Sequence, residues 1–203
     1  METFFSFLER RVDDSSSLLC VGLDPHIPDL KEPTAASALD FCLTLVKQTA
    51  PYAAAFKPNA AFFEVFGAEG WVVLKQVIEA IHEESSRLGS MIPIILDAKR
   101  GDIASTANAY AQSAFENLGV NCITLNPYLG HDSIEPFIGN PEKGFSFYAK
   151  PPTRVPWTCK MCWCCPPAQT APCLYIITSR ISRKNGMSTT TLASSLAQPT
   201  RRL

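Results

Sequence analysis

The sequence of this 203-residue chain predicts an α/β fold, and within that class a barrel of parallel strands. Short apolar runs alternate with segments of helical periodicity to about residue 144, and this alternation is typical of parallel sheets covered by helices. Polar residues stand at the end of each expected strand. A barrel brings all these ends to one rim, whereas an open sheet gathers polar groups only near its switch point. No glycine-rich phosphate loop follows the first strand, which also weighs against a nucleotide-binding sheet.

The first half of the chain carries clear signals for two strands and the helices around them. The apolar run that ends at Leu23 has the length of one buried strand. Thr34 can cap a helix, and Pro51 stops it. The elements expected here are helices over residues 1–10, 34–50, 61–66 and 68–88, and strands over residues 18–23 and 53–56.

The second half repeats the pattern. A run rich in β-branched residues precedes a charged turn, Asp102 is a good N-cap for the helix that follows, and Gly119 ends that helix. The elements expected here are strands over residues 92–96 and 120–125, helices over 102–118 and 131–138, and a fifth strand that starts near residue 145.

Composition excludes several classes of function. With a formal net charge of −1, the chain offers no electrostatic case for binding nucleic acid or an anionic membrane. The sequence has no run of 18 apolar residues, so no membrane span is predicted. The amino terminus lacks the basic region of a signal peptide. Cys20, Cys42 and Cys122 are scattered in apolar settings, as expected of buried, reduced thiols in the cytosol. We therefore expect a cytoplasmic protein that binds neither nucleic acid nor membrane.

The densest chemistry lies in residues 97–102, directly after the third strand. Side chains two apart on an extended backbone face the same way, so Asp97 and Lys99 can point into one site. Asp97 and Asp102 flank the lysine and favour its protonated form, which makes it a well-placed acid. A surface turn of mixed charge would have the same composition. A metal site built on the two aspartates is the other alternative, although Lys99 already supplies positive charge there.

A barrel would collect a larger charged set on one rim. Carboxylates and ammoniums that alternate in this way suit a reaction that creates a carbanion, because a carboxylate can stand beside the departing group and an ammonium can protonate the carbon left behind. No histidine, serine or cysteine constellation competes with this set, since the three histidines lie far apart in the sequence. The set is Asp24, Lys57, Asp97, Lys99 and Asp102.

Four motifs in this order resemble orotidine 5′-phosphate decarboxylase, in the branch with the longer bacterial-type chain. They are VGLDP (residues 21–25), FKPNAAFFE (56–64), LDAKRGDIAST (96–106) and LNPYLGHDS (125–133). The resemblance covers residues 1 to about 144. It implies a (β/α)8 barrel of the TIM type that needs no cofactor and no metal. The implied reaction converts orotidine 5′-phosphate (OMP) to UMP and CO2 in de novo pyrimidine biosynthesis, and the intact family form is a homodimer.

The resemblance also implies roles for individual residues. Lys99 would protonate pyrimidine C6, Asp97 would lie near the substrate carboxylate, and Asp102 with Thr106 would reach into the site of the partner subunit. The implied catalytic residues are Lys99, Asp97, Asp102 and Lys57. The implied substrate-binding residues are Asp24, Lys57, Asn59, Thr106, Asn126 and Ser133.

After Gly144 the sequence departs from the family, which continues with further strands and an arginine-bearing loop that grips the phosphate. The segment that follows is dense in proline, cysteine and tryptophan and ends in a Ser/Thr-rich stretch. A zinc site is not favoured, because the segment has one CxxC motif, no second spaced pair and no nearby histidine. The cysteines concerned are Cys159, Cys162, Cys164 and Cys165.

The genetic code suggests a different origin for this segment. Read one base out of frame, the codons of Met161 to Cys165 must encode Val-Leu-Val-Leu, an apolar run like the one expected of the family. We therefore expect residues 1–144 to form the amino-terminal part of a decarboxylase barrel, about five βα units. Residues 145–203 would be a frameshifted, poorly ordered tail that impairs this chain.

Two other interpretations stay open. One is a magnesium-dependent sugar-phosphate decarboxylase or synthase of the same superfamily, against which the motifs at residues 56–64 and 125–133 speak. The other is a barrel fragment without catalytic activity that binds partners through exposed apolar surface.

Overall fold

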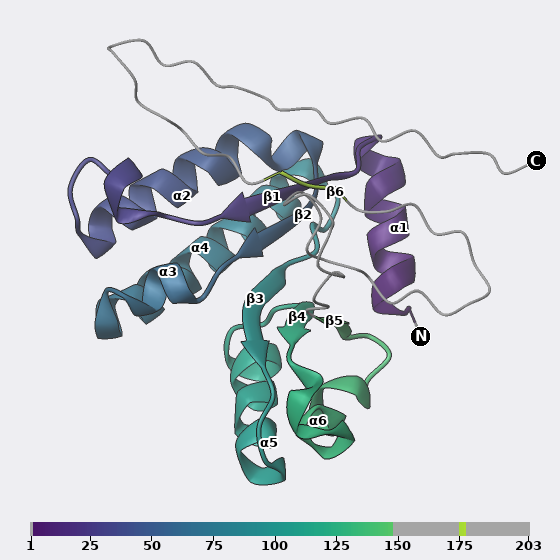
Figure 1. Ribbon diagram of the computed structural model, residues 1–203. Coiled ribbons are helices and arrows are strands. Elements are labelled where there is room, and N and C mark those ends of the chain that lie inside the picture. Colours follow the sequence, from purple (N-terminus) through teal and green to yellow (C-terminus); the bar gives the residue numbers. More distant parts are fainter. Residues whose placement is uncertain (1, 148–174, 178–203) are drawn as a thin grey trace, which may run out of the picture.

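The computed structural model describes residues 2–147 and the backbone of residues 175–177 (Figure 1). Strands and helices alternate, as the sequence predicts. The strands are β1 (Leu19–Leu23), β2 (Ala53–Pro58), β3 (Ile95–Arg100), β4 (Cys122–Leu125), β5 (Gly144–Phe147) and β6 (Tyr175–Ile177). The α-helices are α1 (Phe4–Ser15), α2 (Ala35–Thr49), α3 (Ala61–Glu64), α4 (Gly67–Leu88), α5 (Ala104–Gln112) and α6 (Glu135–Ile138). Short helical turns cover Ile27–Asp29, Ala50–Tyr52, Ser113–Asn117, Pro127–Leu129 and His131–Ser133.

All paired strands run parallel. One sheet has the order β2-β1-β6 and the other the order β3-β4-β5. Isolated parallel bridges, Phe56 to Ile94 and Asn59 to Asp97, join β2 to β3. The strands therefore follow one another in the order β6-β1-β2-β3-β4-β5, which is part of the wall of a parallel barrel. This confirms the predicted α/β barrel class.

The strand β6 is an addition to the sequence prediction. The sequence indicates five strands and assigns everything after residue 144 to an aberrant tail, yet Tyr175–Ile177 pairs in register with Leu19–Val21 of β1. In a closed barrel the first strand borders the last. β6 occupies that border position.

The helix boundaries follow from local signals, with corrections at α1, which runs over Phe4–Ser15 and not over residues 1–10, and at α5. The Thr34 hydroxyl accepts from the Ser37 amide and caps α2, as predicted, and Gly89 (φ 67°) ends α4 in the left-handed conformation. The prediction that Asp102 caps α5 is wrong by one residue. The N-cap is Ile103, and the Asp102 carboxylate accepts from the amide of that residue (2.7 Å), because the loop turns one residue later than the sequence suggests.

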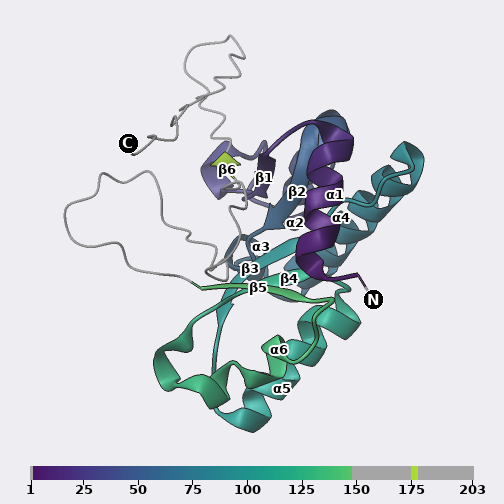
Figure 2. The same ribbon diagram turned by 90° about the vertical axis from the view of Figure 1, so that its right-hand side faces the viewer.

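Alternate residues of the strands face inward and form layers. The layer near the strand starts is apolar, and the first helix covers it. Figure 1 shows α1 beside the amino-terminal ends of β1 and β2, at the opposite end from α3, and Figure 2 shows it crossing β2. The buried side chains packed together here are Phe4 and Leu8 of α1 and Cys20, Ala55, Ile95 and Cys122 of the strands. This end of the barrel wall is therefore closed by hydrophobic packing, and polar chemistry is left to the other end.

Arg11 fixes α1 in this place. Its guanidinium is buried and donates to the carbonyl oxygens of Ala53 (2.9 Å) and Ala50 (2.7 Å). The Ala50 carbonyl belongs to the turn after α2 and the Ala53 carbonyl to the first residue of β2, so the arginine joins α1 to both of these elements. The outward faces of the strands pack against α2, α4, α5 and α6 in the main hydrophobic core. None of the helices in residues 2–147 has the length and apolar character that a membrane span requires.

Candidate active site

The second inward layer, near the carboxyl ends of the strands, is charged. Lys57 lies two residues after Ala55 on β2, and Asp97 lies two residues after Ile95 on β3, so both side chains face inward. The Lys57 ammonium donates to Oδ2 of Asp97 (2.9 Å), and both side chains are almost fully buried. The Lys99 ammonium donates to the other oxygen, Oδ1 (2.5 Å), and stays 45% exposed. The structure therefore brings together three of the four residues implied to be catalytic.

Burial and charge act in opposite directions on Asp97. Burial alone would raise the pKa of its carboxyl group, but the Lys57 charge and the hydrogen bonds from Lys99 and Lys57 outweigh it and hold that pKa below its ordinary value. Asp97 is therefore a buried carboxylate that stays ionised at neutral pH, which fits a reaction in which negative charge is needed next to a substrate group.

Asp24 differs from Asp97 although it borders the same site. It follows β1 directly, and burial raises the pKa of its carboxyl group more than the nearby Lys57 charge lowers it. Its Oδ1 atom is buried and has no hydrogen-bond partner within the described residues. A buried oxygen without a partner is costly, so this atom fits a ligand hydroxyl, as the resemblance implies for Asp24.

The route by which Lys99 reaches Asp97 differs from the prediction. Asp97 and Lys99 were expected two residues apart on an extended strand, with their side chains on one face. Lys99 instead has φ 47°, in the left-handed region. The register between β3 and β4 shifts between Leu96 and Arg100, which places residues 97–99 opposite Thr124 alone. The Thr124 hydroxyl accepts from the amides of Ala98 and Lys99 and donates to Asp97. Thr124 is not among the residues predicted from the sequence, although its inward position, two residues after Cys122, could have indicated it.

Asp102 and Thr106 do not join this ion-pair network. No ion pair among the described residues includes Asp102, whose side chain instead accepts from the backbone of the next residue. Thr106 is half-buried in the first turn of α5. Within a single chain both residues lie beside the site rather than in it, and their implied contact with a partner subunit stays a prediction.

The loop after β4 comes close to the charged turn after β3. The Asn126 amide donates to the Arg100 carbonyl (2.7 Å), and a side chain at Gly101 would collide with the Asn126 carbonyl, so only glycine fits there. The Asn126 side chain accepts from the Tyr128 amide (3.1 Å). Ser133 is buried and donates to the Gly130 carbonyl (2.6 Å). These two predicted substrate ligands therefore shape the loop at the rim.

Asn59 holds the corresponding position after β2. Its backbone pairs with Asp97, and its side chain accepts from the Ala61 amide at the start of α3 (3.3 Å). It thus lies at the same rim as the charged layer, where the resemblance places a substrate ligand.

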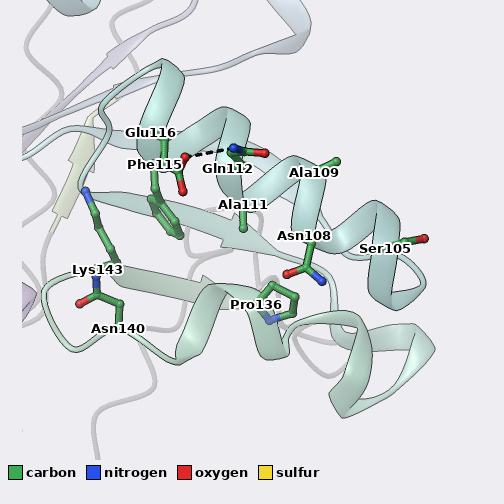
Figure 3. Close-up of a pocket in the computed structure, with 10 residues that line it drawn as sticks. All are labelled: Ser105, Asn108, Ala109, Ala111, Gln112, Phe115, Glu116, Pro136, Asn140 and Lys143. Carbon is green, nitrogen blue, oxygen red and sulfur yellow. Dashed lines mark hydrogen bonds between the residues drawn. The ribbon is translucent and has the colours of Figure 1, made fainter.

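The described residues contain no group of three or more histidine, cysteine, aspartate or glutamate side chains that could hold a metal ion. A hollow of about 650 Å³ lies between α5 and α6 (Figure 3). Residues such as Asn108, Gln112 and Lys143 line it, and none of the predicted site residues does. The candidate site is therefore the open charged rim and not this hollow.

The buried ion pairs make stability depend on pH. The pKa of Asp97 is lower in the folded chain than in the unfolded chain, so this carboxylate contributes stability that is fully present above about pH 4, the ordinary aspartate pKa. This contribution is lost as the pH falls through the folded-state pKa. Asp97→Asn should lower the free energy of unfolding at pH 7 by about 3 kcal/mol, because Lys57 is left buried without its partner.

Urea unfolding of both proteins at pH 7 and pH 3 measures this effect. The loss of stability on acidification should be smaller in Asp97→Asn than in the wild type. Asp40→Asn, at an exposed position on α2, is the matched control and should behave like the wild type. An acid dependence equal in all three proteins would contradict the assignment.

Known proteins share the sequence motifs of this chain. A family model described as orotidine 5′-phosphate decarboxylase / HUMPS family matches residues 17–189, which extends past residue 144, where the sequence motifs end. Orotidine 5′-phosphate decarboxylase of Herpetosiphon aurantiacus is 47% identical over 143 residues, which is 69% of this chain and 51% of the relative. The enzyme of Roseiflexus castenholzii is 44% identical over 144 residues, which is 70% of this chain and 50% of the relative. The chain spans about half the length of the curated relatives it matches.

Solved structures give the same answer. OMP decarboxylase of Leishmania donovani is 51% identical, with a TM-score of 0.62, over 72% of this chain and 53% of that one. UMP synthase of the same organism is 50% identical, with a TM-score of 0.62, over 72% of this chain and 30% of that one. The matched length, the sequence identity and the charged rim agree: this chain belongs to the orotidine 5′-phosphate decarboxylase / HUMPS family.

Proposed function

We propose that this chain carries the charged catalytic residues of an orotidine 5′-phosphate decarboxylase. This enzyme is a carboxy-lyase that forms UMP and CO2. The observation that carries the proposal is the contact between the Lys99 ammonium and the buried Asp97 carboxylate (2.5 Å). The two curated relatives described above bear this name and are 47% and 44% identical over about 70% of the chain, which supports the same activity here.

The geometry supports a mechanism without a covalent intermediate. The bond between C6 and the substrate carboxylate breaks, CO2 leaves, and the electron pair stays on C6. Lys99, whose ammonium contacts Asp97 and is half-exposed, donates a proton to that carbon. Buried Asp97 keeps its charge through Lys57 and stands beside the departing carboxylate. The rest of the substrate would be bound by Asn59, Thr106, Asn126, Ser133 and Asp24. The Oδ1 atom of Asp24 has no hydrogen-bond partner within the described residues.

An assay of OMP decarboxylation, with and without EDTA, tests the proposal. Turnover that EDTA does not change is expected, because the proposed mechanism needs no metal and Lys99 supplies the positive charge. The second candidate is a magnesium-dependent sugar-phosphate decarboxylase or synthase, because the description of the matched family model also includes the HUMPS family. The magnesium-dependent candidate would be favoured if the chain turns over a sugar phosphate and EDTA abolishes that turnover. A chain that binds no UMP would favour a barrel without catalytic activity.

We further propose that the active form is a homodimer in which Asp102 and Thr106 serve the neighbouring site. Both residues lie beside the charged network and contribute nothing to it within one chain. Exposed apolar side chains stand next to them and near the loop after β4, namely Ile103, Tyr128 and Leu129. A second copy packed on this rim would cover them.

Mixing two inactive variants tests the shared site. In a mixed dimer of Lys99→Ala and Asp102→Ala chains, one site has both defects and the other has neither. At equal mixing about a quarter of the wild-type activity should return, whereas each variant alone stays inactive. Subunit exchange is verified with two affinity tags. Full exchange without recovered activity would show that Asp102 works within its own chain.

We also propose that residues 1–144 are the decarboxylase part and that residues 145–203 reflect a shift of reading frame, which impairs turnover. Sequencing of the DNA around codons 144–148 tests this directly. A cytoplasmic location is proposed as well. Its support is that the cysteines of the described residues, Cys20, Cys42 and Cys122, are buried free thiols.

A further inference from the structure

We infer that Thr124 on β4 is a positioning residue that holds Asp97 and Lys99 in their working geometry. The effect of Thr124 on turnover rests on the proposed function. The first observation is the irregular pairing of β3 with β4, in which residues 97–99 stand opposite Thr124 alone. Such a bulge leaves backbone N–H groups of the longer strand without partners in the ladder.

The Thr124 hydroxyl takes the place of the missing partners. Its Oγ1 accepts from the amides of Ala98 (3.0 Å) and Lys99 (2.9 Å) and donates to Oδ1 of Asp97 (2.9 Å). A hydroxyl has one donor and two acceptor sites, so all three are in use. Thr124 is 2% exposed, and water therefore cannot replace these bonds without a local opening.

These three bonds control both ends of the Lys99 side chain. At one end they hold the backbone of Lys99, whose φ of 47° is unfavourable for a lysine and persists only where the surroundings enforce it. At the other end they fix Oδ1 of Asp97, the same oxygen that the Lys99 ammonium contacts. One hydroxyl thus sets where the lysine side chain starts and where its ammonium is held.

A buried hydroxyl with a purely structural role exists in the same chain and serves as a control. Ser85 of α4 is 1% exposed, donates to the Ile81 carbonyl (2.7 Å) and accepts from the Ile92 amide (3.1 Å). Ile92 precedes β3, so these bonds lie at the end of that strand away from the charged rim. Ser85→Ala removes buried hydrogen bonds without touching the bulge.

Amide hydrogen exchange in the full 203-residue chain tests the inference without any need for activity. Thr124→Val keeps the shape of the side chain and removes the hydroxyl, so the Ala98 and Lys99 amides should exchange at least ~10-fold faster. Thr124→Ser should protect them as the wild type does, and Ser85→Ala should expose the Ile92 amide instead. Unchanged protection in Thr124→Val, or its loss in a folded Thr124→Ser, overturns the inference. The serine variant decides the matter even where the valine variant does not fold.

Turnover is the second measurement, in whichever form of the chain decarboxylates OMP. Thr124→Val should lower kcat by ~100-fold, the effect of displacing a reacting group by about 1 Å, while KM changes much less. Thr124→Ser should restore kcat, and Ser85→Ala should leave it unchanged. A Thr124→Val protein with wild-type kcat, or a Thr124→Ser protein as slow as it, overturns the positioning role. Absence of turnover in every form would refute the proposed function, and amide exchange would then still decide whether Thr124 holds the bulge.

Discussion

In a chain with the family's reading frame restored, replacement of Lys99 by alanine is expected to lower kcat for OMP decarboxylation by about 10²–10⁴-fold, the usual contribution of a positioned proton donor. The fold should survive, because the Lys99 side chain is 45% exposed and Lys57 still neutralises Asp97 after its removal. Affinity for UMP should change much less than kcat. The reason is that Lys99 acts on charge that develops only as the carboxylate departs.

The comparison needs a control at a lysine outside the site. Lys75→Ala, at an exposed position of α4, removes the same side chain and the same charge and should leave kcat unchanged. Circular dichroism and urea unfolding of the three proteins establish that they are folded alike. A Lys99→Ala protein that keeps more than about a tenth of the wild-type kcat, a loss below ~1.4 kcal/mol, would refute the proton-donor role.

Sequence periodicity predicted the architecture well, because the information it needs is local. Apolar runs with polar residues at their ends predicted five of the six strands that the described residues form. The same ends placed Asp24, Lys57 and Asp97 at one rim. These inferences need only the two-residue period of a strand and the parallel arrangement of a barrel. The strand β6 was missed although its residues, Tyr-Ile-Ile, are typical of a strand, because everything after residue 144 was assigned to a frameshifted tail.

The contact between Asp97 and Lys99 was predicted for a reason that proved incomplete. Simple alternation on an extended strand would place both side chains on one face, but Lys99 is in the left-handed conformation within a bulge. What enforces that conformation is Thr124, which is 25 residues away from Lys99 in the sequence. Long-range hydrogen bonds of this kind, like that of Arg11 to Ala53, have no periodic signature, and only the folded chain reveals them.

The shift of the α5 cap has the same origin. Asp102 has the right side chain for an N-cap and the right place in the sequence. Its backbone amide, however, points to the Ser133 carbonyl (3.4 Å), and the loop after β4 packs on Gly101. Contact between these two loops delays the helix by one residue and presents Asp102 at its edge. Tertiary contact therefore overrides local propensity at the point where a partner subunit is proposed to bind.

The second large effect is expected from the carboxyl-terminal part of the chain. A version in which one base near codon 145 restores the family's reading frame should decarboxylate OMP with a far higher kcat/KM than the 203-residue chain. Motifs for the charged rim are present in residues 21–133, but the arginine-bearing loop that the family uses to grip the phosphate is not recognisable in this sequence. Each charge-assisted contact with the phosphate contributes about 1.5–3 kcal/mol, which is roughly 10–100-fold in rate when it also holds the reacting ring in place.

Both versions are assayed side by side at equal concentration of folded protein, and UMP binding is measured for each. A chain ending at residue 147 is the control, because it keeps the described rim and removes the segment in question. The corrected chain should bind UMP more tightly and turn over OMP at least ~100-fold faster than the other two, as expected when two or more phosphate contacts are added. Since the chain spans about half the length of its curated relatives, the strands added in the corrected frame should also complete the barrel wall between β5 and β1, in place of β6. If the 203-residue chain decarboxylates OMP within tenfold of the corrected chain, the frame shift is not the cause of any impairment, and residues 145–203 must supply the phosphate contacts themselves.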